Sequence, residues 1–318
     1  MTTRQATLVS IVAPFYNEGE VVESFYQAMS DVLDGHSDTR FEVICVDDGS
    51  RDDTLQRLIM LTNRDARFSV IELSRNFGKE AALTAGLDAA KGDAVIPIDA
   101  DLQDPPELIP TLIAAWQRGA DIVLAERVDR ESDGFLKRTT ATLFYRLHNS
   151  LSKVQIPGNV GDFRLLDKSV LEGLKQLPER QRFMKGLFAW VGFNTVTVAY
   201  SRKPRNAGST KYSWWALLNH ALEGLTSFST EPLRLCAYAG GITAVATLVY
   251  AGFILMRTLI RGVDVPGYAS ILVAILFLGS LQLLGIGLLG EYVGRIYMET
   301  KQRPTYLVRR LHKRANED

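Results

Sequence analysis

The sequence predicts an α/β domain, built on a mostly parallel sheet, that is joined to a membrane hairpin. In the first half of the chain, short apolar runs alternate with segments of helical periodicity, which is typical of a parallel sheet covered by helices on both faces. Two long uncharged stretches follow in the second half. Acidic residues stand directly after the apolar runs, and the carboxyl ends of parallel strands are where such sheets bind ligands.

The expected strands are apolar runs, and the segments between them are the expected helices. In the segment 21–32, Val21, Phe25, Met29 and Val32 recur at helical spacing, so one helix face is apolar. Pro105-Pro106 opens a helix over 107–118, where a missing N–H costs nothing, and Gly119 ends it. The apolar runs are residues 8–13, 41–46, 68–73, 94–98 and 121–125.

Composition excludes some function classes. The 318 residues include 36 Lys plus Arg and 36 Asp plus Glu, and this balance gives no basic excess for binding nucleic acid. The positions of Cys45 and Cys236 in apolar stretches favour a reducing compartment over a disulfide framework. The first apolar run stops at Pro14 and is too short for a signal peptide, so we expect the first domain in the cytosol.

The two uncharged stretches cover residues 235–256 and 265–290. At about 1.5 Å per residue even the shorter one spans roughly 33 Å, against a hydrocarbon layer of about 30 Å. The alternative is a pair of buried core helices, which rarely run so long without a charge. The connection 257–264 is short, so the stretches form a hairpin whose two ends face the same side.

Basic residues dominate the segment after the hairpin, where Glu299 is the one acid between Arg295 and Arg314. This excess places the tail, and with it the catalytic domain and both termini, on the cytoplasmic side of the plasma membrane in a multi-pass arrangement. The sequence therefore divides into a catalytic domain, 1–230, a hairpin, 231–294, and a basic tail, 295–318. Segments 135–151 and 211–229 carry apolar stripes with basic or tryptophan residues and are expected at the membrane interface; ordinary packing on the domain is the alternative.

The strongest chemical motif is Asp99-Ala100-Asp101, which closes the fourth apolar run and is followed by Gln103. Carboxylates two residues apart at a strand end can bind one hard cation, Mg²⁺ or Mn²⁺, together with phosphate oxygens and water. Such an ion would neutralise a departing diphosphate. A solvated loop of acids that caps the next helix is the alternative.

The other strand ends carry related groups. Pro14-Phe15-Tyr16-Asn17-Glu18 follows the first run and Asp47-Asp48-Gly49-Ser50 the second. The acids can accept hydrogen bonds from a base or a ribose, and Gly49 permits a tight turn. After the third run, the segment 75–79 ends in Lys79 and adds cations where phosphates can sit.

These four segments, in this order, resemble the GT-A domain of glycosyltransferase family 2. The whole chain resembles the polyprenyl-phosphate branch of this family, over about residues 8–306. The segments 75–107, 161–164 and 182–187 and the two-span C-terminus are most similar to bactoprenol glucosyltransferases. The resemblance implies a GT-A, Rossmann-like fold, and an enzyme that transfers glucose from UDP-glucose to undecaprenyl phosphate.

The resemblance also implies roles for individual residues. Glu18 and Asp48, with Pro14, Tyr16 and Lys79, would bind the donor. Asp99, Asp101 and Gln103 would hold the metal and the diphosphate, and Asp101 would act in catalysis. A loop closing over the donor phosphates would contribute Arg205, Ser209 and Lys211. The family loop usually reads Gly-x-Ser-Lys-Tyr, whereas the segment 208–212 reads Gly-Ser-Thr-Lys-Tyr, with Ser and Thr adjacent before Lys.

Asp162 resembles the proposed catalytic base, but an acceptor phosphate is already anionic at neutral pH. Asp162 can therefore orient the acceptor or the sugar instead, or simply pair with Arg164. Arg127 and Arg138 match arginines that bind the lipid phosphate, a role suited to their planar fork; Arg138 can also be an interfacial cation. The implied partners are a UDP-sugar, a polyprenyl phosphate, the bilayer and further copies in a homotetramer. The alternatives are another sugar (mannose or an aminoarabinose derivative), a processive synthase, or a non-enzymatic membrane partner.

Overall fold

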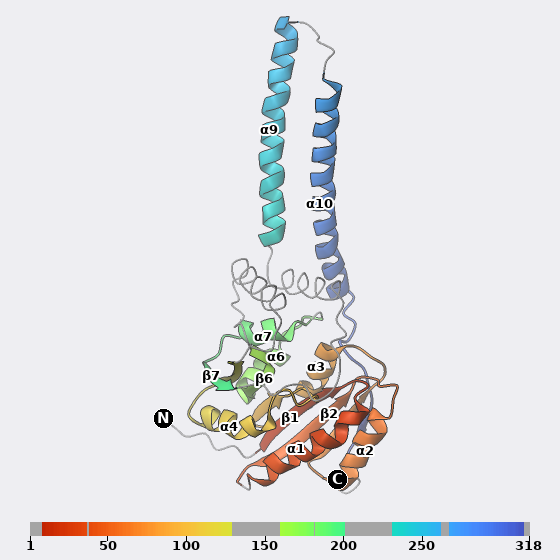
Figure 1. The fold of residues 1–318 in the computed structure, drawn as a ribbon, viewed down its shortest axis with the longest axis vertical. Coiled ribbons are helices and arrows are strands. Elements are labelled where there is room, and N and C mark those ends of the chain that lie inside the picture. The colour runs from red at the N-terminus through yellow and green to blue at the C-terminus, as the bar shows by residue number, and fades with distance from the viewer. Residues whose placement is uncertain are drawn as a thin grey trace.

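The computed structural model describes residues 8–36, 38–128, 160–180, 182–200, 231–261 and 267–314. Its centre is an eight-stranded sheet in the order β7-β5-β6-β4-β1-β2-β3-β8 (Figure 1). Strands β1, β2, β3 and β4 pair in parallel, β7 is parallel to β5, and β6 and β8 are antiparallel to their neighbours. The strands are β1 Leu8–Phe15, β2 Arg40–Asp47, β3 Phe68–Leu73, β4 Ala94–Pro97, β5 Ile122–Arg127, β6 Val160–Asp167, β7 Thr195–Tyr200 and β8 Val308–His312.

The five predicted strands are confirmed, with small shifts at their ends. Residues 68–73 form β3 without any change, whereas β1 and β2 continue to Phe15 and Asp47. The fifth strand lies further along the chain than predicted and ends at Arg127, because Glu126 and Arg127 pair with Ala199 and Tyr200 of β7. The end of this strand is therefore determined by its pairing with a strand that is distant in the sequence, which the local hydrophobic pattern does not reveal.

Helices cover both faces of the sheet, as predicted. One face packs against α1 Val22–Asp34, α2 Thr54–Arg64 and α4 Ile109–Gln117. The other packs against α3 Lys79–Ala89, α6 Lys168–Lys175 and α7 Met184–Trp190. Alternation along β1 explains the two cores: Ile11 points into the first, Val12 into the second.

Two helices differ in detail from the prediction. In α1 the buried residues include Val22 and Leu33, while Val21 and Val32 at the edges of the predicted stripe are half-buried. Val21 lies in a short 3₁₀ helix, η1 Gly19–Val21. The helix predicted over 107–118 is a 3₁₀ turn, η2 Pro106–Leu108, followed by α4, and Gly119 ends it with a φ of 105°.

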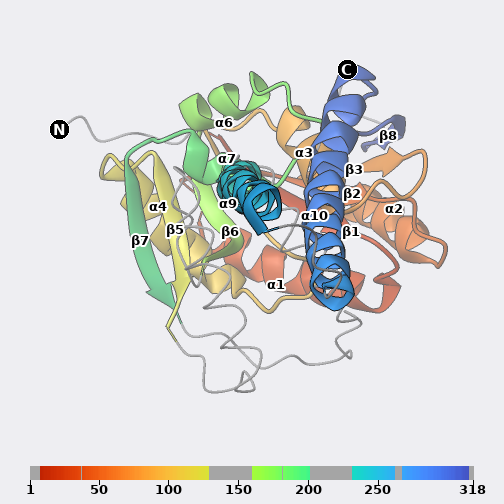
Figure 2. The same cartoon turned by 90° about the horizontal axis from the view of Figure 1, so that it is seen from above.

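The hairpin is formed by two long helices, α9 Glu231–Arg261 and α10 Tyr268–Thr300. They stand side by side, and the start of α9 and the end of α10 both lie next to the α/β domain (Figures 1 and 2). Large apolar side chains on both are exposed, such as Ile242 at 72% and Leu283 at 71%. Among the described residues, one stretch, Phe277–Thr300, is apolar and long enough to cross a membrane.

Helix α10 runs ten residues past the predicted end of the second span, and Gly267 precedes it outside the helix. Within the segment predicted as a basic tail, α10 continues to Thr300, and Val308–His312 forms β8 and pairs with β3. Glu72 of β3 holds this edge strand through Arg309 at 3.2 Å and His312 at 3.0 Å. The predicted interfacial segments, 135–151 and 211–229, lie outside the described residues.

Candidate active site

The loops after β1 and β2 are tied together at the carboxyl edge of the sheet. The backbone N–H of Asn17 donates to Ser50 Oγ at 3.0 Å, and Asn17 Oδ1 accepts from the backbone of Arg51 at 2.8 Å. The backbone N–H of Glu18 donates to Thr54 Oγ1 at 2.9 Å. Asn17 adopts a left-handed conformation, with φ 52°, which asparagine tolerates better than most residues. The predicted donor-binding segment 14–18 is therefore fixed against the segment 47–54.

Asp48 connects this pair of loops to the one after β3. Its carboxylate accepts from the backbone N–H groups of Phe77 at 2.7 Å and Gly78 at 2.9 Å. Burial raises the pKa of Asp48, although the two hydrogen bonds partly oppose that rise. Gly49 next to it has φ 67°, and a Cβ there would lie 2.5 Å from the backbone of Arg75. The tight turn predicted at Gly49 is confirmed.

Three charged side chains meet where β4 ends and β6 begins. Lys79 Nζ lies 2.7 Å from Oδ1 and 2.9 Å from Oδ2 of Asp99, and 2.7 Å from Oδ2 of Asp162. β4 pairs with β6 in antiparallel orientation, with Ala94 opposite Asp167, so the end of β4 and the start of β6 lie at the same edge of the sheet. We call Lys79, Asp99 and Asp162 the acid–lysine cluster.

The electrostatics of this cluster keep its members charged. Burial opposes ionisation of Asp162, but Lys79, Lys185 and Arg164 outweigh it and lower its pKa to about 2. Burial likewise opposes the charge on Lys79, yet Asp162 and Asp99 raise its pKa above the usual value. Asp162 Oδ1 is buried and accepts no hydrogen bond from any described residue. A buried carboxylate oxygen of this kind is suited to a donor group on a ligand.

The second aspartate of the motif is held by its own loop. Asp101 accepts from the backbone N–H of Gln103 at 3.2 Å and from the Gln103 side-chain amide. Leu102 between them has φ 53°, so the chain turns sharply here. Across the described residues, no three His, Cys, Asp or Glu side chains converge as a ready metal site. A cation at Asp99 and Asp101 would therefore need further oxygen ligands from a substrate or water.

Glu80 is a partly buried acid of this region that the sequence analysis does not single out. Its carboxylate accepts from the backbone N–H of Met184 at 3.3 Å and so links α3 to the start of α7. Burial and then the charge of Asp162 raise its pKa to about 7, while Lys79 and Lys185 oppose the rise. A glutamate with this pKa changes its charge in the neutral range.

We expect Glu80→Gln to stabilise the protein more at pH 8 than at pH 5. The folded state raises the pKa of Glu80, so its contribution to stability is complete below the unfolded pKa and is lost as pH rises to about 7. Glutamine can still accept from Met184 and carries no charge. The melting temperature of the variant relative to wild type should rise by at least about 3 °C between these pH values. The exposed acid Glu20, as Glu20→Gln, serves as the control; a difference independent of pH would contradict the expectation.

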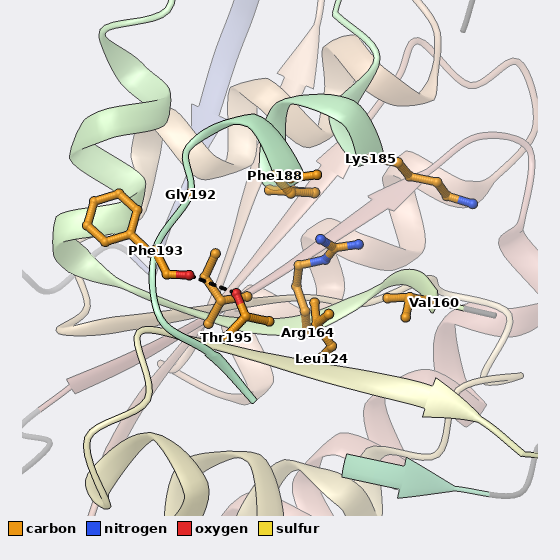
Figure 3. A pocket seen from close by; sticks show the side chains of 10 residues that line it. Leu124, Val160, Arg164, Lys185, Phe188, Gly192, Phe193 and Thr195 are labelled. Atoms are coloured by element: carbon orange, nitrogen blue, oxygen red, sulfur yellow. Dashed lines mark hydrogen bonds between the residues drawn. The ribbon is translucent and has the colours of Figure 1, made fainter. Parts of the chain in front are cut away.

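A cavity of about 250 Å³ lies beneath α7 against β5, β6 and β7 (Figure 3). Its walls are mostly apolar, and Arg164 and Lys185 are its cations. The Arg164 guanidinium carbon lies 4.2 Å from the centre of the Phe188 ring, and its Nη2 donates to the Gly161 carbonyl at 2.6 Å. Alternation along β6 puts Arg164 on the same face as Asp162, so the cavity adjoins the acid–lysine cluster.

The remaining predicted site residues lie at the same edge of the sheet or outside the described residues. Pro14 is in β1 opposite Val46, and Tyr16 just after it is 42% exposed. Arg127 ends β5, next to the start of β6. Arg138, Arg205, Ser209 and Lys211 fall in segments outside the described residues. The structure therefore brings Lys79, Asp99 and Asp162 into contact, and the roles of all the predicted site residues stay predictions.

Sequence reasoning missed two further features of this edge. Asp104 is buried and accepts a hydrogen bond from the Tyr200 hydroxyl at the end of β7. This bond connects the loop after β4 to a strand that the sequence analysis does not predict. Lys185 contributes to the charge balance of Asp162 from α7. The alternation of β-branched residues in Thr195–Val198 is a signal that identifies β7, but no local pattern indicates the contact with Asp104.

Comparison with known families agrees with this geometry. The profile of Glycosyl transferase family 2 matches residues 10–174, which run from within β1 to the end of β6 and beyond and include the acid–lysine cluster. The profile of the GtrB C-terminal hairpin matches residues 231–296, which cover α9 and most of α10.

Individual relatives match over nearly the whole chain. An uncharacterised glycosyltransferase of Synechocystis sp. is 51% identical, with 94% of each chain covered. A prophage bactoprenol glucosyl transferase homologue of Escherichia coli is 50% identical, covering 96% of this chain and 99% of that protein. The bactoprenol glucosyl transferase of Shigella phage SfII is also 50% identical, with coverage of 96% and 98%.

Proposed function

This chain belongs to glycosyltransferase family 2, with a GT-A fold and a GtrB-type C-terminal hairpin, and from that premise we propose that it transfers glucose from UDP-glucose to undecaprenyl phosphate. The observation that carries the proposal is the 50% identity with bactoprenol glucosyl transferases over nearly the full length of both chains. The product would be a polyprenyl-phosphate-linked sugar at the cytoplasmic face of the membrane.

The donor would lie across the ends of β1, β2 and β4. The interlocked loops that carry Tyr16, Glu18 and Asp48 form a fixed edge there, suited to the uridine. Lys79 stands where β4 ends, beside the place expected for the diphosphate. Arg205, Ser209 and Lys211 remain proposed phosphate ligands by family resemblance.

The residues at the end of β4 fit a divalent cation. Asp99, Asp101 and Gln103 would supply oxygen ligands, since Mg²⁺ is commonly held by one or two carboxylates together with substrate phosphates and water. The structure supports a cation at this place, because an ammonium group already rests on both oxygens of Asp99. When bound, Mg²⁺ or Mn²⁺ would offset the charge that develops on the leaving diphosphate.

The proposed reaction is a displacement with inversion at the anomeric carbon. An oxygen of the lipid phosphate forms the new bond to that carbon, and the bond to the UDP oxygen breaks. The acceptor needs no deprotonation, and a carboxylate with a pKa of about 2 is a weak base. We therefore assign Asp162 the role of orienting the acceptor or a sugar hydroxyl, for which its buried Oδ1 is available.

The acceptor would approach from the membrane side of the domain. Helices α3, α6 and α7 lie between the sheet and the hairpin (Figure 1), and Arg127 ends β5 at the same edge as Asp162. We propose Arg127 and Arg138 as ligands of the lipid phosphate. Anchoring by a two-span hairpin would hold the site at the bilayer surface. The oligomeric state is a separate matter, and we propose a homotetramer on family resemblance alone.

The purified full chain in lipid nanodiscs tests the proposal through UDP release. We expect release from UDP-glucose that depends on added undecaprenyl phosphate and stops in chelator. A panel of radiolabelled nucleotide sugars, which includes mannose and aminoarabinose donors, identifies the sugar. Transfer that is equally fast to water-soluble acceptors, or that persists unchanged in chelator, would overturn the proposal.

A further inference from the structure

Lys79 contacts a carboxylate that is proposed to bind the divalent cation. Its Nζ contacts both oxygens of Asp99, at 2.7 and 2.9 Å. A divalent ion bound to the same carboxylate needs at least one of those oxygens. Because like charges repel at such distances, a metal on Asp99 and the ammonium group oppose each other's binding in this arrangement.

The same ammonium group balances the second acid. Asp162 Oδ2 lies 2.7 Å from Lys79 Nζ, so one ammonium group contacts both carboxylates. Without a cation between them, two partly buried carboxylates would repel each other. Lys79 therefore neutralises charge on both carboxylates, which a bound metal ion would also do.

The Lys79 side chain is also placed so that it can move away from Asp99. It is the first residue of α3, its side chain is 45% exposed, and Gly78 before it has φ 99° with open space around its Cα. The arriving diphosphate offers a new anionic partner for the ammonium group. The contact with Asp162 can persist while the contact with Asp99 is exchanged.

We propose that Lys79 is the resident cation of the donor site, that it competes with the divalent ion for Asp99, and that metal binding is therefore weak until the donor arrives. This inference rests on the metal site of the proposed function. It makes Lys79 a positioning residue, which holds Asp162 and regulates access of the ion to Asp99. It also predicts an order of binding in which the metal enters with the nucleotide sugar.

The test measures Mn²⁺ binding by the electron paramagnetic resonance signal of the free ion, on the full chain without nucleotide. Lys79→Met should bind Mn²⁺ about fivefold to tenfold more tightly than wild type, because an ion pair of this kind no longer has to be broken. Lys79→Arg keeps the positive charge and should bind as weakly as wild type. Lys185→Met is the matched control, since Lys185 acts on Asp162 from α7; it should change the affinity by less than about twofold.

The outcomes separate this inference from the proposed function. If Mn²⁺ binding does not depend on Asp101, as judged with Asp101→Asn, the metal site itself fails and both ideas fall. If binding depends on Asp101 but Lys79→Met binds no more tightly than wild type, the competition alone is overturned. An equal gain in Lys185→Met would also overturn it, because the effect would then be one of general charge. Unfolding curves of each variant exclude a loss of fold as the cause.

Discussion

Asp101→Asn is expected to lower the rate of sugar transfer by about 100-fold to 1,000-fold, the usual loss when a group that stabilises developing charge is removed. Asp101 is the second aspartate of the proposed metal motif, and its loop is turned by its contacts with Gln103. Asparagine keeps the size of the side chain and can still accept from the backbone of Gln103. The substitution therefore removes the charge that binds the cation and leaves the turn in place.

The measurement is UDP release at saturating undecaprenyl phosphate, together with Mn²⁺ affinity in the presence of UDP. Both should fall in Asp101→Asn, and the far-ultraviolet circular dichroism should not change. Asp31→Asn, an exposed acid on α1 that accepts from Gln27, removes the same charge far from β4 and should behave as wild type. Near-normal turnover of Asp101→Asn with metal present would remove the proposed role of the metal.

The sequence predicts the centre of the fold well and its edges poorly. Residues 68–73 form β3 as predicted because every residue of that run except Ser69 is buried, so the hydrophobic pattern alone defines the strand. Strand β8 carries Arg309, Arg310 and His312 and has no apolar pattern. It becomes a strand because β3 offers an open edge and Glu72 pairs with its basic residues.

The candidate active site likewise has a part that the local sequence pattern predicts and a part that it does not. The acids at the ends of β2 and β4 follow from strand–helix alternation, since parallel strands present their carboxyl ends at one edge. Asp162 lies on an antiparallel strand far along the chain, and only family resemblance draws attention to it. Its contact with Lys79 depends on the register between β4 and β6, a non-local property that composition and spacing do not determine.

Asp162→Asn is expected to lower kcat by about 100-fold or more and to change the affinity for UDP by less than about threefold. In the proposed arrangement the residue lies beside the reacting groups and not at the uridine edge, so its loss should affect the transition state more than donor binding. The loss of its charge also leaves Lys79 with Asp99 as its one partner in the cluster. Isothermal titration with UDP and turnover with undecaprenyl phosphate separate the two effects, and a loss confined to affinity would make Asp162 a donor-binding residue.

The pH dependence of turnover decides whether Asp162 orients the acceptor or acts as a base. With a pKa of about 2, Asp162 is ionised throughout the range in which the protein is assayed. An acidic decline in rate near pH 6 would then belong to the second ionisation of the acceptor phosphate, which lies at about that pH. The residual activity of Asp162→Asn should keep this decline at the same pH. If the decline disappears in the variant, the titrating group is Asp162 itself, and the carboxylate removes a proton in the reaction.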